Sequence, residues 1–462
     1  MNQRTKANLA MGAFLCACLI PSLGMLAPEE PAAANQVLAW PPALTAREGG
    51  LNPGVLEETT DYVADHFALR QRLITANAAL EGAVFGTSAQ DSVLMGREGW
   101  LFYRETVEDY LHTDPMTDRE LYGAARTLAL LTEYANARGA RLVFTVAPNK
   151  ASLYPQHLPY VGEPLAGQDD IDRLTPLLEA QGVAYIDLFA PFRAQDGVLY
   201  HAADSHWTNR GAALAHDTLI EGLGLEGRTE WFTQPGQETG AHRGDLYEML
   251  YPTGGKTEPE TEFDRGFGFT AVRPIRSPED MRIQTENPDR DGSLLMFRDS
   301  FGNTLYPFMA DSFGKATFSR SVPYQMSLLE ETGADTVVIE LVERNLDYLT
   351  RYAPVFPAPL RELTGEPPSG EAAARITAWD SGQLEGYIRL AGTLSGPVDV
   401  DSPVYVRLGD ALYEATPAGE AEQEVYPFML YVPGGSPPED AQVFYLLDGR
   451  VLRAGQTEFS PD

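Results

Sequence analysis

The chain has 462 residues, a formal net charge of −32 and 44% hydrophobic residues, which suits a folded protein of two or three domains. This acidity argues against nucleic-acid binding, because neutralising a phosphate backbone requires clustered Lys and Arg. The only cysteines, Cys16 and Cys18, lie near the N-terminus. The rest of the chain therefore has no disulfide framework, no cysteine metal site and no nucleophilic cysteine.

The first 34 residues have the three zones of a secretory signal. Arg4 and Lys6 precede the apolar run ANLAMGAFLCACLIPSLGMLA, and small residues follow up to Ala34. A bilayer span takes roughly 20 residues, so an uncleaved N-terminal membrane anchor is the alternative to a cleaved signal peptide. In both cases we expect export to the periplasm or the cell surface.

Residues 35–90 are predicted to form a helical lead-in, because apolar residues in VLEETTDYVADHFALRQRLITANAALEGAVFG recur at helical spacing. Directly after it, two apolar pieces flank a Gly-Arg-Glu-Gly turn in SVLMGREGWLFYRE. This pattern is typical of a β-hairpin.

Strand and helix patterns alternate through residues 91–363. Strands are predicted at 141–150, 183–192, 292–300, 315–321 and 334–346, and helices at 118–139, 170–182, 208–224 and 301–314. Continuous apolar strands separated by helices indicate an α/β domain with a mostly parallel sheet covered on both faces. The polar stretch at about 225–290, rich in Gly, Pro and Glu, is predicted to be an insertion.

A linker at 364–373 precedes a compositionally different C-terminal segment. Short alternating runs separated by turn signals fill residues 374–462. They predict a small all-β module, β-sandwich-like in architecture and a candidate for carbohydrate binding.

The segment HAADSHWTNRGAALA, which begins at His201, is the first candidate for chemistry. Thr208 is the better N-cap for the helix that follows, which leaves Asp204 and His206 available. An aspartate can fix the tautomer of a histidine that acts as a base. The alternatives are a helix start alone, or a zinc site of His201, Asp204 and His206 with His242 as a remote ligand. No second cluster has metal-ligand spacing, so we expect no metal and no other cofactor.

The segment FRDSFGN supplies a nucleophile candidate in Ser300. The serine follows an apolar strand and precedes a short helix, where its hydroxyl is exposed and backbone N–H groups can hold an oxyanion. The G-x-S-x-G pattern of an α/β-hydrolase is absent. The simpler alternative is that Ser300 only caps the helix.

Together these motifs resemble the SGNH-hydrolase-like family that contains the alginate O-acetyltransferases of the bacterial periplasm and the DHHW proteins. ADSHWTNRGA resembles its D-x-H-W-T-x-x-G-A segment, and RDSFGN its Asp-Ser segment; GREGWLFYRE, VAPNKASLYPQHLP and HRGDLYEML also have counterparts in the same order. The resemblance covers about residues 90–350 and implies a flavodoxin-like sheet. It implies Ser300 as nucleophile, His206 as general base and Asp204 as its orienting partner.

Further candidates follow from the same resemblance. Arg298 stands where the family commonly has a glycine, which changes access or charge beside the nucleophile. Asn303 and the Ser300 N–H are candidates for an oxyanion hole, and Tyr306 for contact with a sugar. Lys150 matches a recurrent lysine that serves structure or function. Arg243 and Asp245 are placed near the cleft by the same motif match, and His201 is expected to stand outside the chemistry.

Three functions remain open from the sequence. The preferred one is an O-acetyltransferase that takes acetyl groups from a membrane O-acyltransferase partner and passes them through acetyl-Ser300 to an exported polysaccharide. The second is a carbohydrate acetylesterase with the same triad. The third is a non-catalytic glycan-binding scaffold of an exopolysaccharide system, in which the β module does the binding.

Overall fold

The computed structural model describes residues 38–461 except 47–48, 226, 381–382, 420–423 and 435–439. It also describes a few helical positions before residue 20. The predicted signal segment at residues 1–34 therefore lies almost wholly outside the described residues. Within the described part of the chain, no helix combines the length and the apolar character needed to cross a bilayer.

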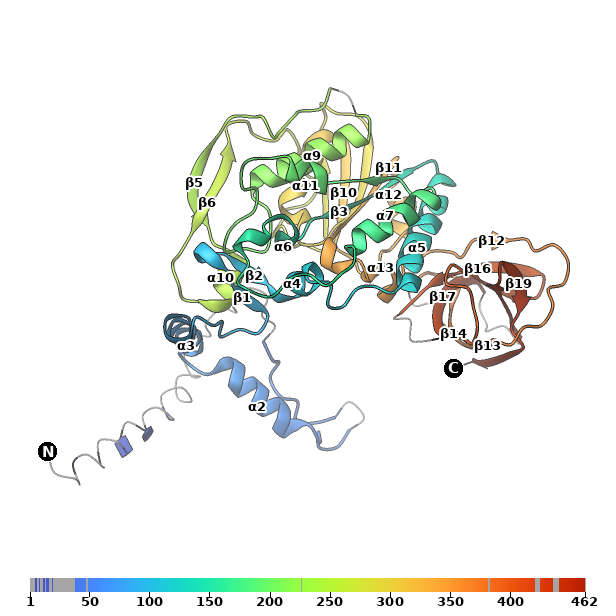
Figure 1. Cartoon of the computed structure of the whole chain (residues 1–462), viewed down its shortest axis with the longest axis horizontal. Coiled ribbons are helices and arrows are strands. Elements are labelled where there is room, and N and C mark those ends of the chain that lie inside the picture. The colour runs from blue at the N-terminus through green and yellow to red at the C-terminus, as the bar shows by residue number, and fades with distance from the viewer. Residues whose placement is uncertain are drawn as a thin grey trace.

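The lead-in forms two helices, α2 (Val55–His66) and α3 (Arg70–Phe85), separated by Leu69 in the left-handed region at φ 68°. Both lie at the margin of the molecule (Figure 1), and α2 has no buried residue. The predicted hairpin follows as the antiparallel pair β1 (Val93–Met95) and β2 (Leu101–Tyr103).

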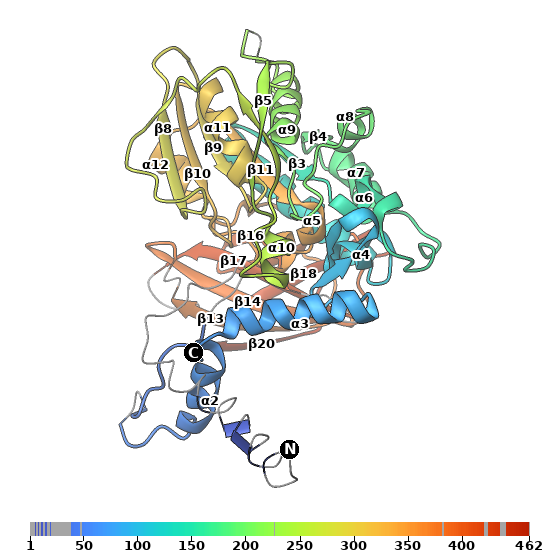
Figure 2. The same cartoon turned by 90° about the vertical axis from the view of Figure 1, so that its left-hand side faces the viewer.

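A seven-stranded sheet in the order β4-β3-β11-β9-β10-β8-β7 forms the centre of the α/β domain (Figure 2). The pairs β3–β4, β3–β11, β11–β9 and β9–β10 are parallel, whereas β8 and β7 extend one edge antiparallel. The strands are β3 (Arg141–Ala147), β4 (Tyr185–Ile186), β7 (Thr270–Ala271), β8 (Arg282–Glu286), β9 (Ser293–Phe297), β10 (Lys315–Ser319) and β11 (Thr336–Val342). The predicted α/β fold with a mostly parallel sheet is confirmed.

Helices cover both faces of this sheet. Successive side chains of a strand point to opposite faces and therefore pack in two different hydrophobic cores. Val143 of β3 packs with α9 (Asn209–Gly222) and α11 (Gly302–Ser312). Its neighbour Phe144 packs on the other face, in the core that contains residues of α5 (Asp118–Asn136), α7 (Asp170–Ala180) and α12 (Ser327–Thr332). Shorter elements are α4 (Arg104–Tyr110), α6 (Lys150–Leu153), α8 (Phe189–Arg193), α10 (Asp245–Leu250), α13 (Tyr348–Arg351), η1 (Arg97–Gly99), η2 (Pro155–His157) and η3 (Glu343–Asn345).

Two stretches differ from the sequence prediction. The strand expected over 183–192 is only two residues long, because Asp187 accepts hydrogen bonds from the N–H groups of Phe189 and Ala190 and starts helix α8 there. Strand β8 lies inside the stretch expected to be an insertion, yet it pairs with β10 in the central sheet. The apolar content of a segment alone therefore did not show where β4 ends or that β8 belongs to the central sheet.

Another part of that stretch forms the antiparallel pair β5 (Gly236–His242) and β6 (Glu258–Phe263) at the margin of the domain. Helix α10 lies between the two strands in sequence and below them in the view of Figure 1. No residue of β5 or β6 is fully buried. The pair is held to the domain by polar contacts such as the Asn209 N–H to Glu260, and by Phe263, whose ring packs against Trp231 and Phe308.

The C-terminal region is a separate β structure. Its strands hydrogen-bond in the order β19-β18-β15-β16-β17-β14-β13-β20, and β12 pairs with β16. Their bounds are β12 (Leu360–Arg361), β13 (Ala373–Asp380), β14 (Tyr387–Ser395), β15 (Val404–Leu408), β16 (Ala411–Pro417), β17 (Val425–Pro433), β18 (Gln442–Leu447), β19 (Arg450–Arg453) and β20 (Gln456–Pro461). Residues such as Leu390, Val406 and Phe428 form its own core.

An ion-pair network joins this β region to helix α5, beside which it lies (Figure 1). The fully buried Glu414 of β16 accepts two hydrogen bonds from Arg126 of α5, at 2.6 and 2.7 Å, and one from Arg361 at 2.7 Å. Arg361 also pairs with Glu133 of α5. Because a buried carboxylate without partners is costly, this network fixes how the two parts pack.

Candidate active site

The three residues predicted to form a triad meet beyond the carboxyl ends of the parallel strands, where α/β folds commonly place their sites. Strand β9 ends at Phe297, and Ser300 follows just before α11. Asp204 and His206 lie in the loop before α9. The N-cap of α9 is Thr208, whose side chain accepts a hydrogen bond from the Gly211 N–H at 3.1 Å. Asp204 is therefore not needed as a cap.

Hydrogen bonds connect the three side chains in sequence. Ser300 Oγ lies 2.8 Å from His206 Nε2, and His206 Nδ1 lies 2.7 Å from Asp204 Oδ1. The backbone N–H of His206 also donates to Asp204 Oδ1, at 2.8 Å. With the carboxylate accepting from Nδ1–H, the ring presents Nε2 as an acceptor for the Ser300 hydroxyl.

The second oxygen of Asp204 is equally well held. Its Oδ2 accepts from His242 Nε2 at 2.9 Å and from the Asp245 N–H at 3.0 Å. Burial alone would raise the pKa of this carboxyl, but the neighbouring His206 and His242 hold it well below its usual range. Asp204 is therefore a carboxylate at neutral pH.

His206 has an environment suited to a base. Burial on its own lowers the pKa of the imidazole, but the charge and hydrogen bond of Asp204 and the charge of Asp245 raise it above its ordinary value of 6.5. Asp245 Oδ2 lies 3.7 Å from His206 Nδ1 and accepts from Ser205 Oγ at 2.6 Å. The side chain of His206 is 21% exposed, so the ring remains accessible.

Lys150 holds the loop that carries Asp204. Its buried ammonium donates to the carbonyl oxygens of His201 (3.1 Å), Ala202 (3.1 Å) and Asp204 (2.5 Å). Burial lowers the pKa of Lys150 to about 8. The side chain points at the backbone of the loop, which makes Lys150 a positioning residue.

Asp299 holds the nucleophile segment in a similar way. Its Oδ1 accepts from the Phe301 N–H at 2.8 Å, and its Oδ2 from the Val342 N–H at 2.7 Å. These bonds tie the turn around Ser300 to the end of β11. The indole of Trp207 adds a further tie by donating to the Phe301 carbonyl at 3.2 Å.

Arg298 is buried and reaches toward Asn303. Its guanidinium donates to Asn303 Oδ1 at 2.6 Å and to the Pro278 carbonyl at 2.5 Å. The close approach needs Gly302, since a Cβ there would lie 2.6 Å from Arg298 Cβ and Cδ. Tyr306 is also buried, with its ring centroid 5.6 Å from the Arg298 guanidinium carbon, so its contact with a sugar stays a prediction.

A second Asp-His-Ser set shows that these distances alone do not define a site. His216 Nε2 lies 2.7 Å from Ser312 Oγ, and its Nδ1 lies 2.7 Å from Asp217 Oδ1. His216 and Ser312 are 0% exposed, between α9 and α11. Ser300 and His206 differ because both are partly accessible.

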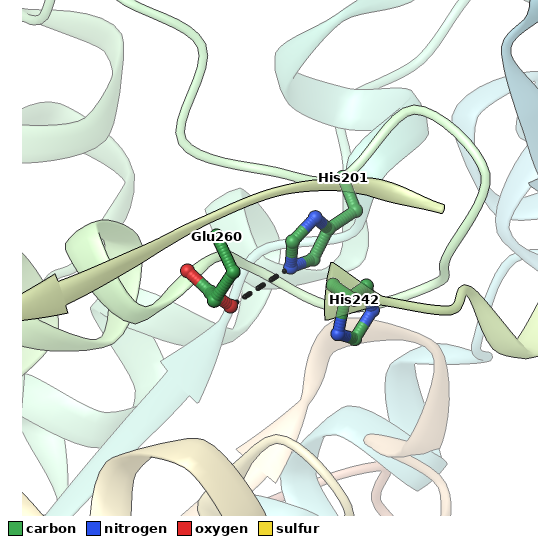
Figure 3. Close-up of side chains that lie close together, drawn as sticks. All are labelled: His201, His242 and Glu260. Carbon is green, nitrogen blue, oxygen red and sulfur yellow. Dashed lines mark hydrogen bonds and ion pairs between the residues drawn. The ribbon is translucent and has the colours of Figure 1, made fainter. Parts of the chain in front are cut away.

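Residues of the segment GAHRGDL complete the surroundings. His242, considered from the sequence only as a remote metal ligand, contacts Asp204 directly. Arg243 points elsewhere, to the Pro252 carbonyl and to Glu248. His201 lies close to the site without contacting the triad side chains: it bonds to Glu260 at 3.1 Å and stacks on His242 (Figure 3). The sequence grouped His242 with Asp204 only as possible metal ligands and did not indicate the direct hydrogen bond between the two side chains.

Comparisons with known proteins show what this chain is similar to. Residues 93–274 match the model of a family described as the SGNH hydrolase-like domain of acetyltransferase AlgX. The "Probable alginate O-acetylase AlgJ" of Pseudomonas syringae pv. tomato is 29% identical over 195 residues, 40% of this chain and 48% of the relative. The protein of the same name from Pseudomonas aeruginosa is 31% identical over 187 residues, 37% and 44% of the two chains.

The chain spans about half the length of these curated relatives. Among solved structures, the O-acetyltransferase domain of Pseudomonas putida AlgJ aligns with a TM-score of 0.37 and 20% identity, over 55% of this chain and 92% of that domain. The matched range 93–274 includes Asp204 and His206. Residues 93–274 of this chain are therefore similar to the SGNH hydrolase-like domain of acetyltransferase AlgX.

Proposed function

We propose that this protein is an O-acetyltransferase that acts on an exported polysaccharide through an acetyl-Ser300 intermediate. The observation that carries the proposal is the accessible hydrogen-bonded series from Asp204 through His206 to Ser300, at 2.7 and 2.8 Å. The acetyl donor would come from a membrane O-acyltransferase, and the reaction would take place in the periplasm or at the cell surface.

In the first half-reaction, His206 Nε2 takes the proton of the Ser300 hydroxyl as Oγ attacks the acetyl carbonyl carbon. A bond forms between Oγ and that carbon, and the bond to the leaving group breaks. The imidazolium, stabilised by Asp204, returns the proton to the leaving group. The product is an ester between Ser300 and acetate.

The oxyanion would be held by two donors. The Ser300 N–H makes no hydrogen bond within the described part of the chain, and it lies at the start of α11, where helix N–H groups favour negative charge. Asn303 Oδ1 is already engaged by Arg298, which leaves the Nδ2 amide hydrogens of Asn303 as the donors. Arg298 is thus a positioning residue for Asn303.

In the second half-reaction, His206 takes a proton from a sugar hydroxyl as the hydroxyl oxygen attacks the acetyl-serine carbonyl carbon. The bond between that carbon and Ser300 Oγ breaks, and the imidazolium returns the proton to Oγ, which regenerates Ser300 and the neutral His206. Water in place of the sugar would give free acetate and make the protein an acetylesterase. The difference between the two functions is therefore the acceptor that reaches the acyl-enzyme.

A chromogenic acetyl ester tests the proposal on the purified protein with and without an acidic polysaccharide acceptor. We expect chromophore release, an acetyl adduct on Ser300 in rapidly quenched samples, and acetyl esters on the polysaccharide. Free acetate with no acetylated polysaccharide would indicate the esterase. Release no faster than in buffer would contradict both enzymes and favour the glycan-binding scaffold.

The pH dependence of kcat/KM should report the environment of His206. The ring acts as a base only when neutral, so activity should rise with pH through its pKa, and the raised pKa places this limb above pH 6.5. Asp245→Asn removes a charge that raises the His206 pKa, so the limb should move to lower pH, by about one unit. Asp264→Asn, on an exposed loop, is the control, and an unmoved limb in Asp245→Asn would contradict the assignment.

A further inference from the structure

A cluster of three metal-ligating side chains lies next to the triad, in the loop before α9 and on the strands β5 and β6. One nitrogen each of His201 and His242 and one carboxylate oxygen of Glu260 all lie within 4.8 Å of one another (Figure 3). His201 Nε2 and Glu260 Oε2 are 3.1 Å apart, and the two imidazole rings stack at 3.7 Å between centroids. Three segments distant in sequence converge here.

The members of the cluster are individually held in place. His201 is buried, with 2% of its side chain exposed. Glu260 is fixed through Oε1, which accepts from the N–H groups of Asn209 (2.9 Å) and Thr261 (2.7 Å), so that Oε2 is the oxygen presented to His201. The register of β5 against β6 shifts between Thr239 and His242. Such irregularities commonly re-aim a side chain next to a functional site.

We propose that His201, His242 and Glu260 bind a divalent transition metal, with Zn²⁺ as the best match. Two imidazoles and one carboxylate, with a fourth position open to water, are a donor set that zinc takes in proteins. Ligand distances of about 2.0–2.2 Å in a tetrahedron place donor atoms roughly 3.4 Å apart. Closure therefore needs the donor atoms to approach one another and one imidazole ring to turn out of its nearly parallel stack, whose interplanar angle is 10°. His201 must then carry its proton on Nδ1, leaving Nε2 to the ion.

The residues around the cluster give His242 a hydrogen-bond partner and leave the cluster open to an approaching ion. A ligating histidine usually donates its other N–H to a carboxylate, and His242 Nε2 already bonds to Asp204 at 2.9 Å. Nδ1 of His242 is therefore the atom that an ion would take without breaking this bond. A cavity of about 410 Å³ borders His201 and Glu260, and Glu238 and Glu258 also line it. Arg210 lines the cavity too, so three carboxylates and one guanidinium border this opening, and their net negative charge favours the approach of a cation.

The placement gives the ion two roles. It would pin β5 and β6, which have no fully buried residue of their own, to the loop that carries Asp204. It would also keep His242 neutral with its N–H on Asp204, and so hold the carboxylate that orients His206. The site goes beyond acetyl transfer, and metal binding can be measured whether or not the proposed function is correct.

Zinc binding can be measured on the full chain, purified without an affinity tag and stripped with EDTA. Titration with Zn²⁺ against a chromogenic chelator should show one ion per chain and a higher Tm in its presence. Co²⁺ should give the strong visible absorption of a tetrahedral site in the unaltered protein. Glu260→Gln and His242→Gln should each weaken Zn²⁺ binding on the order of 100-fold.

Matched controls separate the cluster from other groups. Glu262→Gln, exposed on the same strand as Glu260, and His66→Gln on α2 should bind Zn²⁺ like the unaltered protein. Failure of the unaltered protein to bind Zn²⁺, or unchanged affinity in Glu260→Gln, would overturn the site. Loss of binding in His206→Ala together with full binding in Glu260→Gln would place the ion in the Asp204-His206-Asp245 group instead.

Discussion

Replacing Ser300 with alanine should reduce turnover of an acetyl ester by about 10⁴- to 10⁶-fold, down to background hydrolysis. The side chain supplies the atom that forms the acyl-enzyme, and no other hydroxyl takes its place on His206 Nε2 among the described residues. Steady-state rates and intact-mass spectra should show the loss of both turnover and the acetyl adduct. Thermal unfolding should change little, because Ser300 is only partly buried.

Ser312→Ala is the matched control, since Ser312 makes an equivalent 2.7 Å hydrogen bond to His216. That pair is fully buried, so its loss should lower the Tm and leave kcat within a small factor of the unaltered enzyme. Substantial acetyl-enzyme formation in Ser300→Ala would remove the serine from the mechanism. Equal loss of activity in both variants would show that stability, not chemistry, had been measured.

Asp204→Asn should lower kcat by about 10⁴-fold while keeping the shape of the site. An amide at this position can donate to His206 Nδ1 and stabilise the tautomer with its proton on Nε2, which is then unable to accept the Ser300 proton. It also removes the charge that raises the His206 pKa. The measurement is the pH profile of kcat, in which the defect should persist at every pH where the protein is folded.

Asp217→Asn provides the comparison, because Asp217 also accepts from a histidine Nδ1, at 2.7 Å from His216. Asp217 holds the N–H groups of Trp231 and Phe232, so this variant should lose stability without the loss in kcat. Full activity in Asp204→Asn would mean that the carboxylate is structural, and that Lys150 and the backbone suffice to orient His206.

Local sequence signals predicted much of this fold. Thr208 has the side chain of an N-cap, and the Gly-Arg-Glu-Gly turn lies between two apolar pieces; both features are encoded within a few residues. Helix α8 was missed because a short apolar run is compatible with a strand, and the capping role of Asp187 depends on the backbone direction after it. Strand β8, which lies between β10 and the edge strand β7, was missed because polar residues alternate with its buried Ile283 and Thr285.

The candidate site also contains some contacts that the sequence indicated and others that it did not. The resemblance indicated that Asp204, His206 and Ser300 act together, although 94 residues separate His206 from Ser300. The sequence suggested His242 beside Asp204 only as a metal ligand, and it indicated neither their hydrogen bond nor the contact of Glu260 with His201. These contacts depend on how β5 and β6 fold back over the loop before α9. Contacts between segments far apart in the chain form only in the tertiary structure, so they leave no local sequence pattern.

The tight approach of Arg298 to Gly302 also makes the effects of substitutions at these two positions depend on each other. A side chain at 302 cannot coexist with Arg298 in its present conformation, because a Cβ there would lie 2.6 Å from two of its carbon atoms. The two positions are therefore epistatic: Gly302→Ala alone should disturb the site more than the same substitution combined with Arg298→Gly, so that the two effects do not add.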